Sequence, residues 1–88
     1  MKFNEYAFGV GTGTATVVPF NFTDRCIMTV QSGTSGCIAL AYRSGNSIML
    51  STIGSLGNTG SVFVNSGGQL AVQCNANYQN MRVMAWYV

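Results

Sequence analysis

The sequence has 88 residues, of which 48% are hydrophobic and only 7% are charged, with a formal net charge of +2. Globular domains usually have about 25% charged residues, whereas disordered chains combine high charge with few apolar residues. The composition therefore excludes a disordered chain and predicts a single folded domain over residues 1–88. Free cytoplasmic monomers rely on charge for solubility, so this composition is typical of a protein that works inside an assembly or outside the cell.

The N-terminal segment MKFNEYAF lacks the apolar core of a secretory signal, so we expect no signal peptide. No apolar run approaches the roughly 18 residues of a membrane-spanning helix. We therefore expect neither export through a signal peptide nor a membrane partner.

The first two predicted strands are Phe3–Phe8 and Thr14–Val18. The first strand has aromatic residues at Phe3, Tyr6 and Phe8, and Glu5 is expected to point outward. β-branched residues dominate the second strand, and Pro19 ends it because proline has no backbone N–H to donate to a neighbouring strand.

The stretch Cys26–Arg43 contains two apolar runs around a Gly/Ser/Thr loop, which is the pattern of a β-hairpin. With Ser32–Gly36 as the loop, the predicted register pairs Gln31 with Cys37, Val30 with Ile38, Met28 with Leu40 and Cys26 with Tyr42. Alternation then gathers the large apolar side chains on one face and leaves mostly small or polar ones, with Ile27, on the other. A slip by one residue would mix the two sets, so we expect burial to fix this register.

Two further hairpins are predicted after Arg43. A three-residue loop, Ser44-Gly45-Asn46, places Tyr42 opposite Ile48 and Leu40 opposite Leu50, with Gly45 or Asn46 in the left-handed conformation. The last hairpin pairs Val62 with Val72 and Val64 with Leu70 around the loop Ser66-Gly67-Gly68.

Two segments, Ile53–Gly60 and Asn75–Asn80, are long enough to cross from one sheet to another. The final run MRVMAWYV is apolar on both strand faces, so we expect it to be covered on both. No segment shows a helical period over ten or more residues. Seven or eight short strands at roughly ten-residue spacing suggest a sandwich, a jelly roll or a small barrel, and we predict an all-β, compact antiparallel sandwich of jelly-roll type.

Groups for catalysis and metal binding are scarce. The sequence has no histidine, and its only carboxylate side chains are Glu5 and Asp24. Acid–base catalysis needs positioned titratable groups, a cysteine nucleophile needs a base, and zinc needs closely spaced ligands. We therefore expect no enzymatic activity, no metal and no cofactor. The four basic residues are scattered rather than gathered in a groove, so no nucleic-acid partner is expected.

Three cysteines, Cys26, Cys37 and Cys74, cannot all pair within one chain. In the predicted hairpin register Cys26 faces Tyr42 and Cys37 faces Gln31, so these two do not pair across the hairpin. We predict buried free thiols, as in a reducing compartment.

Phe63, Met84 and Trp86 fall on strand faces opposite the main apolar rows. If both sheet faces are covered within the chain, these residues are simply core. Alternatively, one face is buried only by another copy, because aromatic residues and Met are enriched and charges depleted at the cores of interfaces. In that case the predicted oligomer contact consists of Met84, Trp86, Tyr87 and Val88.

An Asn-rich connection contains Asn75, Asn77, Tyr78 and Asn80. Tyr78 either anchors its own loop or stacks on a sugar, with the three asparagines supplying hydrogen bonds. The second interpretation gives an alternative function, a small lectin-like module that binds a surface glycan.

Low charge, dense turns and strands rich in Gly, Ser, Thr and Asn together resemble small virion proteins of tailed bacteriophages, namely decoration (cement) proteins, head fibres and tail-fibre tips. The resemblance implies a non-enzymatic structural protein that enters a virion in the host cytoplasm, usually as a homotrimer. It implies two kinds of partner, other copies of the chain and a capsid or tail protein. Adhesion would come from apolar strand faces and exposed strand edges.

Overall fold

A computed structural model describes residues 1–9, 11–57, 60–75 and 80–88, and within these ranges every regular element is a β-strand. The strands are β1 (Lys2–Phe8), β2 (Ala15–Val17), β3 (Arg25–Ser32), β4 (Ser35–Ser44), β5 (Ser47–Leu56), β6 (Gly60–Val64), β7 (Leu70–Cys74) and β8 (Met81–Tyr87). The all-β prediction is confirmed, including both strands expected before Pro19. None of the described residues forms a helix long and apolar enough to cross a membrane.

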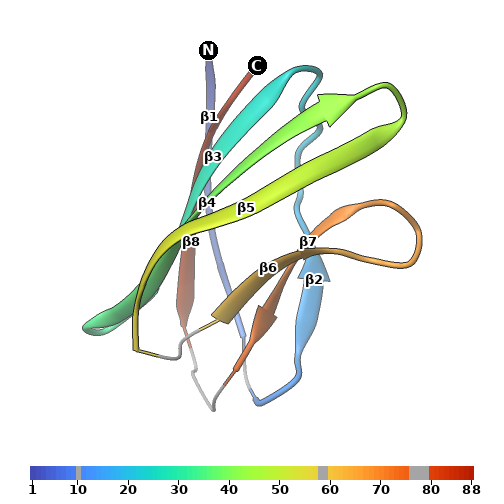
Figure 1. Cartoon of the computed structure of the whole chain (residues 1–88). Helices are drawn as coiled ribbons and strands as arrows, with labels where there is room; N and C mark the ends of the chain where they lie inside the picture. Colours follow the sequence, from blue (N-terminus) through green and yellow to red (C-terminus); the bar gives the residue numbers. More distant parts are fainter. Residues whose placement is uncertain (10, 58–59, 76–79) are drawn as a thin grey trace.

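The strands form two antiparallel sheets. The large sheet has the order β1-β8-β3-β4-β5, and the small sheet has the order β2-β7-β6. The last strand, β8, lies between β1 and β3, so both chain ends emerge side by side (Figure 1). The small sheet packs against one face of the large sheet and leaves the other face without a covering layer (Figure 1).

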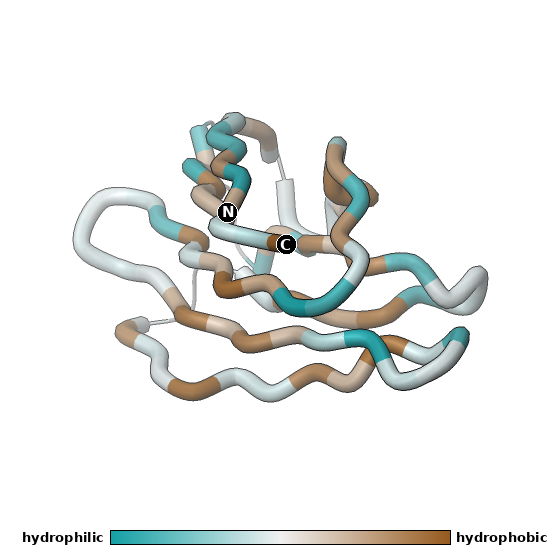
Figure 2. The backbone as a smooth tube through the Cα atoms, turned by 90° about the horizontal axis from the view of Figure 1, so that it is seen from above, coloured by the Kyte–Doolittle hydropathy of each residue, from teal (hydrophilic) through white to brown (hydrophobic). Residues whose placement is uncertain are grey.

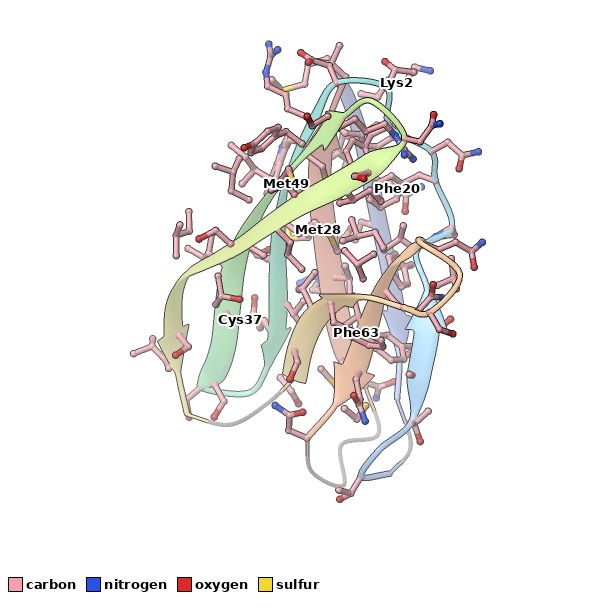
Figure 3. The ribbon with its side chains drawn as sticks, turned by 45° about the vertical axis from the view of Figure 1, so that its right-hand side comes forward. Lys2, Phe20, Met28, Cys37, Met49 and Phe63 are labelled. Carbon is pink, nitrogen blue, oxygen red and sulfur yellow. The ribbon has the colours of Figure 1, made fainter. Side chains whose placement is uncertain are left out.

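The core lies between the two sheets. Its fully buried side chains include Met28 and Val30 of β3, Val72 of β7 and Val83 of β8. Figure 3 shows Met28 in the interior of the sandwich. Burying one such side chain stabilises the folded state by about 1.5–3 kcal/mol, so this shared core holds the two sheets together.

The predicted register of the β3–β4 hairpin is wrong by one residue. A two-residue turn, Gly33-Thr34, replaces the predicted loop Ser32–Gly36, and Gly33 adopts a φ of +58°. Val30 therefore pairs with Cys37 instead of Ile38. The other pairs that replace the predicted ones are Gln31 with Gly36, Met28 with Ala39 and Cys26 with Ala41.

The slip turns β4 over, because shifting a register by one residue moves every side chain to the opposite face. The small side chains of Cys37, Ala39 and Ala41 point into the core, where each is at most 8% exposed. They leave room for β6 of the small sheet, which contacts β4. The larger residues of β4 face solvent instead: Ile38, Leu40 and Tyr42.

The predicted three-residue loop after β4 is also wrong. Ser44 pairs with Ser47 around the two-residue turn Gly45-Asn46, so Tyr42 faces Met49. The left-handed conformation occurs at Gly45, with a φ of +63°, as one of the two predicted alternatives. The register of the β6–β7 hairpin is confirmed, with Val62 opposite Val72 and Val64 opposite Leu70.

Both predicted connections do cross between sheets, but the first is shorter than expected because β5 continues to Leu56. A β-bulge in β5 leaves Ile53 without a partner, since Ala39 pairs with Thr52 and Ile38 with Gly54. The expectation that both faces of the last strand are covered is wrong within this chain. One face of β8 is fully buried, whereas the other has Arg82 exposed and Trp86 only half-buried.

Candidate functional site

The candidate site is the uncovered face of the large sheet, which we call the outer face. It presents apolar side chains from all five strands. They are Phe3, Ile27, Ile38, Leu40, Tyr42, Met49, Met84 and Trp86. Five of the eight are more than 40% exposed. An apolar group of this kind, gathered on one face rather than scattered singly, marks an interaction surface.

The strand registers align the centre of the outer face in one row. Phe3 lies beside Trp86, Trp86 beside Ile27, and Ile27 beside Leu40. The rings of Phe3 and Trp86 are tilted by 48° with centroids 5.4 Å apart, so they support one another as an aromatic pair. Ile27, at the middle of the row, is nevertheless 44% exposed, so the row is an apolar surface that remains in contact with water.

The outer face arises where strands of the large sheet depart from a simple alternation of apolar and polar residues. Hydrophobic and hydrophilic segments alternate along much of the backbone in Figure 2. In β3 and β8, however, apolar residues occupy both faces, and in β4 the larger ones point away from the core. The outer face is thus a second apolar layer that the chain does not bury itself.

Charged groups near the outer face are paired. Arg82 of β8 donates to Glu5 of β1 with a distance of 2.7 Å between Nε and Oε2. Arg25 pairs with Asp24 at the opposite end of the large sheet. These exposed pairs contribute little to stability, but each gives a partner to a charge whose burial alone beneath an apolar surface would cost desolvation free energy.

The guanidinium of Arg43 is held by one loop residue. Its Nε donates to the backbone oxygen of Phe22 at 2.6 Å, and its guanidinium lies 4.8 Å from the centroid of the Phe22 ring. Arg43 therefore links the β2–β3 connection to the end of β4, and its side chain does not lie on the outer face.

The three cysteines are buried free thiols, as predicted. Burial raises the pKa of Cys26 from 9.0 to about 11, and burial also raises the pKa of Cys37. Both thiols stay protonated at neutral pH and are poor nucleophiles. Burial, with a smaller contribution from Cys26, raises the pKa of the Tyr6 hydroxyl to about 12.

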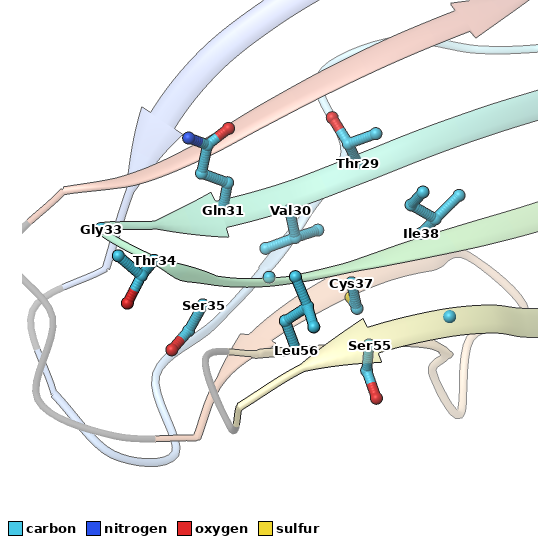
Figure 4. Close-up of a pocket in the computed structure, with 12 residues that line it drawn as sticks. Thr29, Val30, Gln31, Gly33, Thr34, Ser35, Cys37, Ile38, Ser55 and Leu56 are labelled. Atoms are coloured by element: carbon cyan, nitrogen blue, oxygen red, sulfur yellow. The ribbon is translucent and has the colours of Figure 1, made fainter.

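A groove of about 500 Å³ adjoins the outer face where β3, β4 and β5 approach the β3–β4 turn. In Figure 4, Thr29, Gln31 and Ile38 line one side, and Leu56 reaches toward them from β5. The groove has no charged lining residue, and at Gly54 no atom beyond its two chain neighbours lies within 4 Å of the place that a Cβ would take. It extends the uncharged surface from the outer face to the end of β5.

The predicted interface residues are divided between two faces. Met84 and Trp86 lie on the outer face, with Val88 39% exposed just beyond the end of β8. Tyr87 lies on the core face, 9% exposed, and its ring stacks on Phe20 with centroids 4.4 Å apart. Tyr87 thus holds the β2–β3 connection against the core.

The predicted ligand loop is described only at its ends. Asn75 Oδ1 accepts a hydrogen bond from the Ser61 hydroxyl at 3.0 Å, which ties the end of β7 to β6. Asn80 is exposed just before β8. Asn77 and Tyr78 lie outside the described residues. Phe63, which the sequence placed opposite Val62 and Val64, is half-buried on β6 of the small sheet (Figure 3).

Sequence reasoning missed most of the outer face. The predicted register places Ile38 opposite Val30, Leu40 opposite Met28 and Tyr42 opposite Cys26, so all three are expected in the core. The signal that would have found them is the run of small residues at Cys37, Ala39 and Ala41, which suits close packing against a second sheet.

Neither a family model nor a curated protein matches the sequence. Among solved structures, the fold is similar to a crystal structure of the Acinetobacter phage vB_ApiP_P1 tailspike protein, with a TM-score of 0.51 and 14% sequence identity. The similarity covers 94% of this chain and 20% of the tailspike chain, so this chain spans about a fifth of that protein's length. At this identity the likeness concerns the fold, and it shows that such a sandwich occurs within a phage tailspike.

Proposed function

We propose that the protein is a non-enzymatic structural protein of a phage virion, of the decoration or fibre type, that self-associates through its outer face. The observation that supports this most is the apolar row Phe3–Trp86–Ile27–Leu40, which crosses four strands of the large sheet and is left uncovered. The similarity to a phage tailspike supports a fibre-type setting for this fold.

The composition of the outer face favours a second copy as its partner. Its charged margins are paired within the chain, so two copies can meet without like charges facing one another. Its centre combines Trp, Phe, Tyr and Met, which are enriched at the cores of interfaces. A homotrimer is the form that the resemblance to phage virion proteins implies, and the opposite side of the sandwich remains for a capsid or tail protein.

The size of the outer face sets a limit on this contact. Neighbouring strands lie about 4.8 Å apart and residues about 3.3 Å apart along a strand, so the apolar patch measures on the order of 300–400 Å² in plan. A stable protein interface buries about 800 Å² on each partner. The outer face therefore supplies the dry centre of an interface, and surrounding loops or strand edges must supply the rest.

The test is a charged substitution in the middle of the row. Ile27→Glu places an unpaired carboxylate in the contact, and we expect it to weaken self-association at least tenfold, measured by analytical ultracentrifugation over a concentration series. Val17→Glu is the matched control, because Val17 is 42% exposed on the small sheet and Ile27 is 44% exposed on the outer face. Circular dichroism checks that both variants fold. An Ile27→Glu variant that folds and keeps the original mass distribution would refute the proposed contact.

A further inference from the structure

The edge of the large sheet at β5 is unusually open. β5 has ten residues, Ser47–Leu56, and pairs only with β4 in the large sheet. It contains neither a charged residue nor a proline. Natural sheets usually protect their edges with Lys, Pro, short strands or bulges, because unpaired backbone groups recruit further strands.

Two of the three other edge strands show such protection, and the third, β6, is half the length of β5. β1 presents Lys2 and Glu5. β2 has three residues and stops just before Pro19, and β6 has five residues. In β5 the bulge at Ile53 interrupts the ladder, but Ser47–Thr52 before it remains regular. This six-residue segment is the longest unprotected edge among the described strands.

The side chains of this segment are suited to a copy of themselves. Met49 points to the outer face and is 45% exposed, whereas Ile48 and Leu50 point to the core side and are half-buried at its margin. In an antiparallel pair related by a two-fold axis at Met49, the two Met49 residues face one another. Ile48 of each copy then faces Leu50 of the other. Every central pair is therefore apolar, and the two members of each pair lie on the same face of the joined sheet.

We propose that Ser47–Ser51 of β5 pairs antiparallel with the same residues of a second copy, so that two five-stranded sheets join into one continuous sheet. A second copy is favoured over a foreign strand because this register matches apolar to apolar across a two-fold axis without any charge. The added strand also covers the exposed margins of Ile48 and Leu50, which a monomer leaves partly in water. The edge contact shares with the proposed function the premise of self-association, but it uses the backbone edge of β5, and Met49 is the one outer-face residue that takes part in both.

The test is disulfide trapping in the full chain. A Met49→Cys variant brings two thiols to directly opposite positions, where the Cα–Cα distance of about 4.5–5.5 Å suits a disulfide. Ser51→Cys is the matched control on the same strand and face. In this register its two copies are offset by four residues, about 13 Å along the strand, which is beyond disulfide reach. The unsubstituted chain is the second control, because its three cysteines are buried.

We expect a covalent dimer from Met49→Cys under mild oxidation, at least tenfold more than from Ser51→Cys. Equal cross-linking of the two variants would overturn the proposed register and the edge contact with it. No cross-link from Met49→Cys while the chain still sediments as an oligomer would overturn the edge contact and leave the outer face as the interface. If Ile27→Glu abolishes the larger assembly but the Met49→Cys dimer still forms, the edge contact is supported independently of the outer face.

Discussion

The division between a buried and an open face of the large sheet can be tested with two methionines. Met28 of β3 points into the core and is 1% exposed, whereas Met49 of β5 lies on the outer face and is 45% exposed. Replacing a fully buried Met by Ala costs about 2–5 kcal/mol, because apolar contacts are lost and a cavity remains. Removing a side chain that is about half exposed in the monomer costs less than about 1 kcal/mol.

These values are large against the total stability. A domain of this length is stable by roughly 4–13 kcal/mol, at about 0.05–0.15 kcal/mol per residue. With a urea m-value of about 1 kcal/mol per M, Met28→Ala should lower the unfolding midpoint by about 2 M or more. Met49→Ala should lower it by less than about 1 M.

The assay is urea unfolding followed by the fluorescence of Trp86, the single tryptophan, at a concentration dilute enough for the chain to be monomeric. Equal losses of stability in Met28→Ala and Met49→Ala would refute the assignment of the two faces. A larger loss in Met49→Ala would mean that the outer face, not the observed core, is the buried side of the large sheet.

Two further predictions concern the core. Ala39→Leu should destabilise the fold by about 1–3 kcal/mol through overpacking. Ile38→Ala, one residue away on the exposed face, should cost less than about 1 kcal/mol. Thermal unfolding of both variants measures these losses, and the reverse order would support the register predicted from sequence. The pKa of Cys26 is raised to about 11 from 9.0, so between these pH values the folded state keeps a proton that the unfolded chain releases. The stability that the protonated Cys26 thiol contributes is therefore fully present below about pH 9 and is lost as the pH rises toward 11. Urea midpoints at pH 8 and pH 10.5, compared with those of Cys26→Ala, should show a smaller loss in the variant, and an identical loss would contradict burial of this thiol.

Much of the fold could be predicted from alternation and turn residues. The β6–β7 hairpin was predicted in register because Asn65-Ser66-Gly67-Gly68-Gln69 specifies its own turn. Asn65 Oδ1 accepts from the backbone N–H groups of Gly67 and Gln69 at 3.0 and 2.9 Å, and Gly68 takes a φ of +77°. Local hydrogen bonds of this kind fix the turn, and with it the register of the hairpin, without help from residues distant in the sequence.

The β3–β4 register could not be predicted from the hairpin alone. Pairing the larger residues of both strands on one face, Met28 with Leu40, gives the more apolar face, and this choice is sound for an isolated hairpin. The structure instead pairs Met28 with Ala39, because β4 must also accommodate the small sheet that contacts it. That constraint comes from β6, which begins 16 residues after β4 ends, and its local trace in the sequence is the run of small residues at Cys37, Ala39 and Ala41.

The candidate site was predicted in part. The final run MRVMAWYV showed that β8 has two apolar faces, and this located Met84 and Trp86 on the candidate surface. The sequence could not show that only one face is covered within the chain, because coverage depends on how far the small sheet extends across the large one. Tyr87 was grouped with the interface by its position in sequence, but alternation places it with the core.

Self-association is the claim on which both proposals depend, and the solution mass of the unsubstituted chain tests it most directly. Native mass spectrometry and light scattering from about 1 to 100 μM should give masses that are multiples of 9.3 kDa, the mass of one chain, with the larger species favoured at higher concentration. A mass of 9.3 kDa throughout this range, with the fold intact by circular dichroism, would contradict the assignment of both the outer face and the β5 edge as contacts between copies.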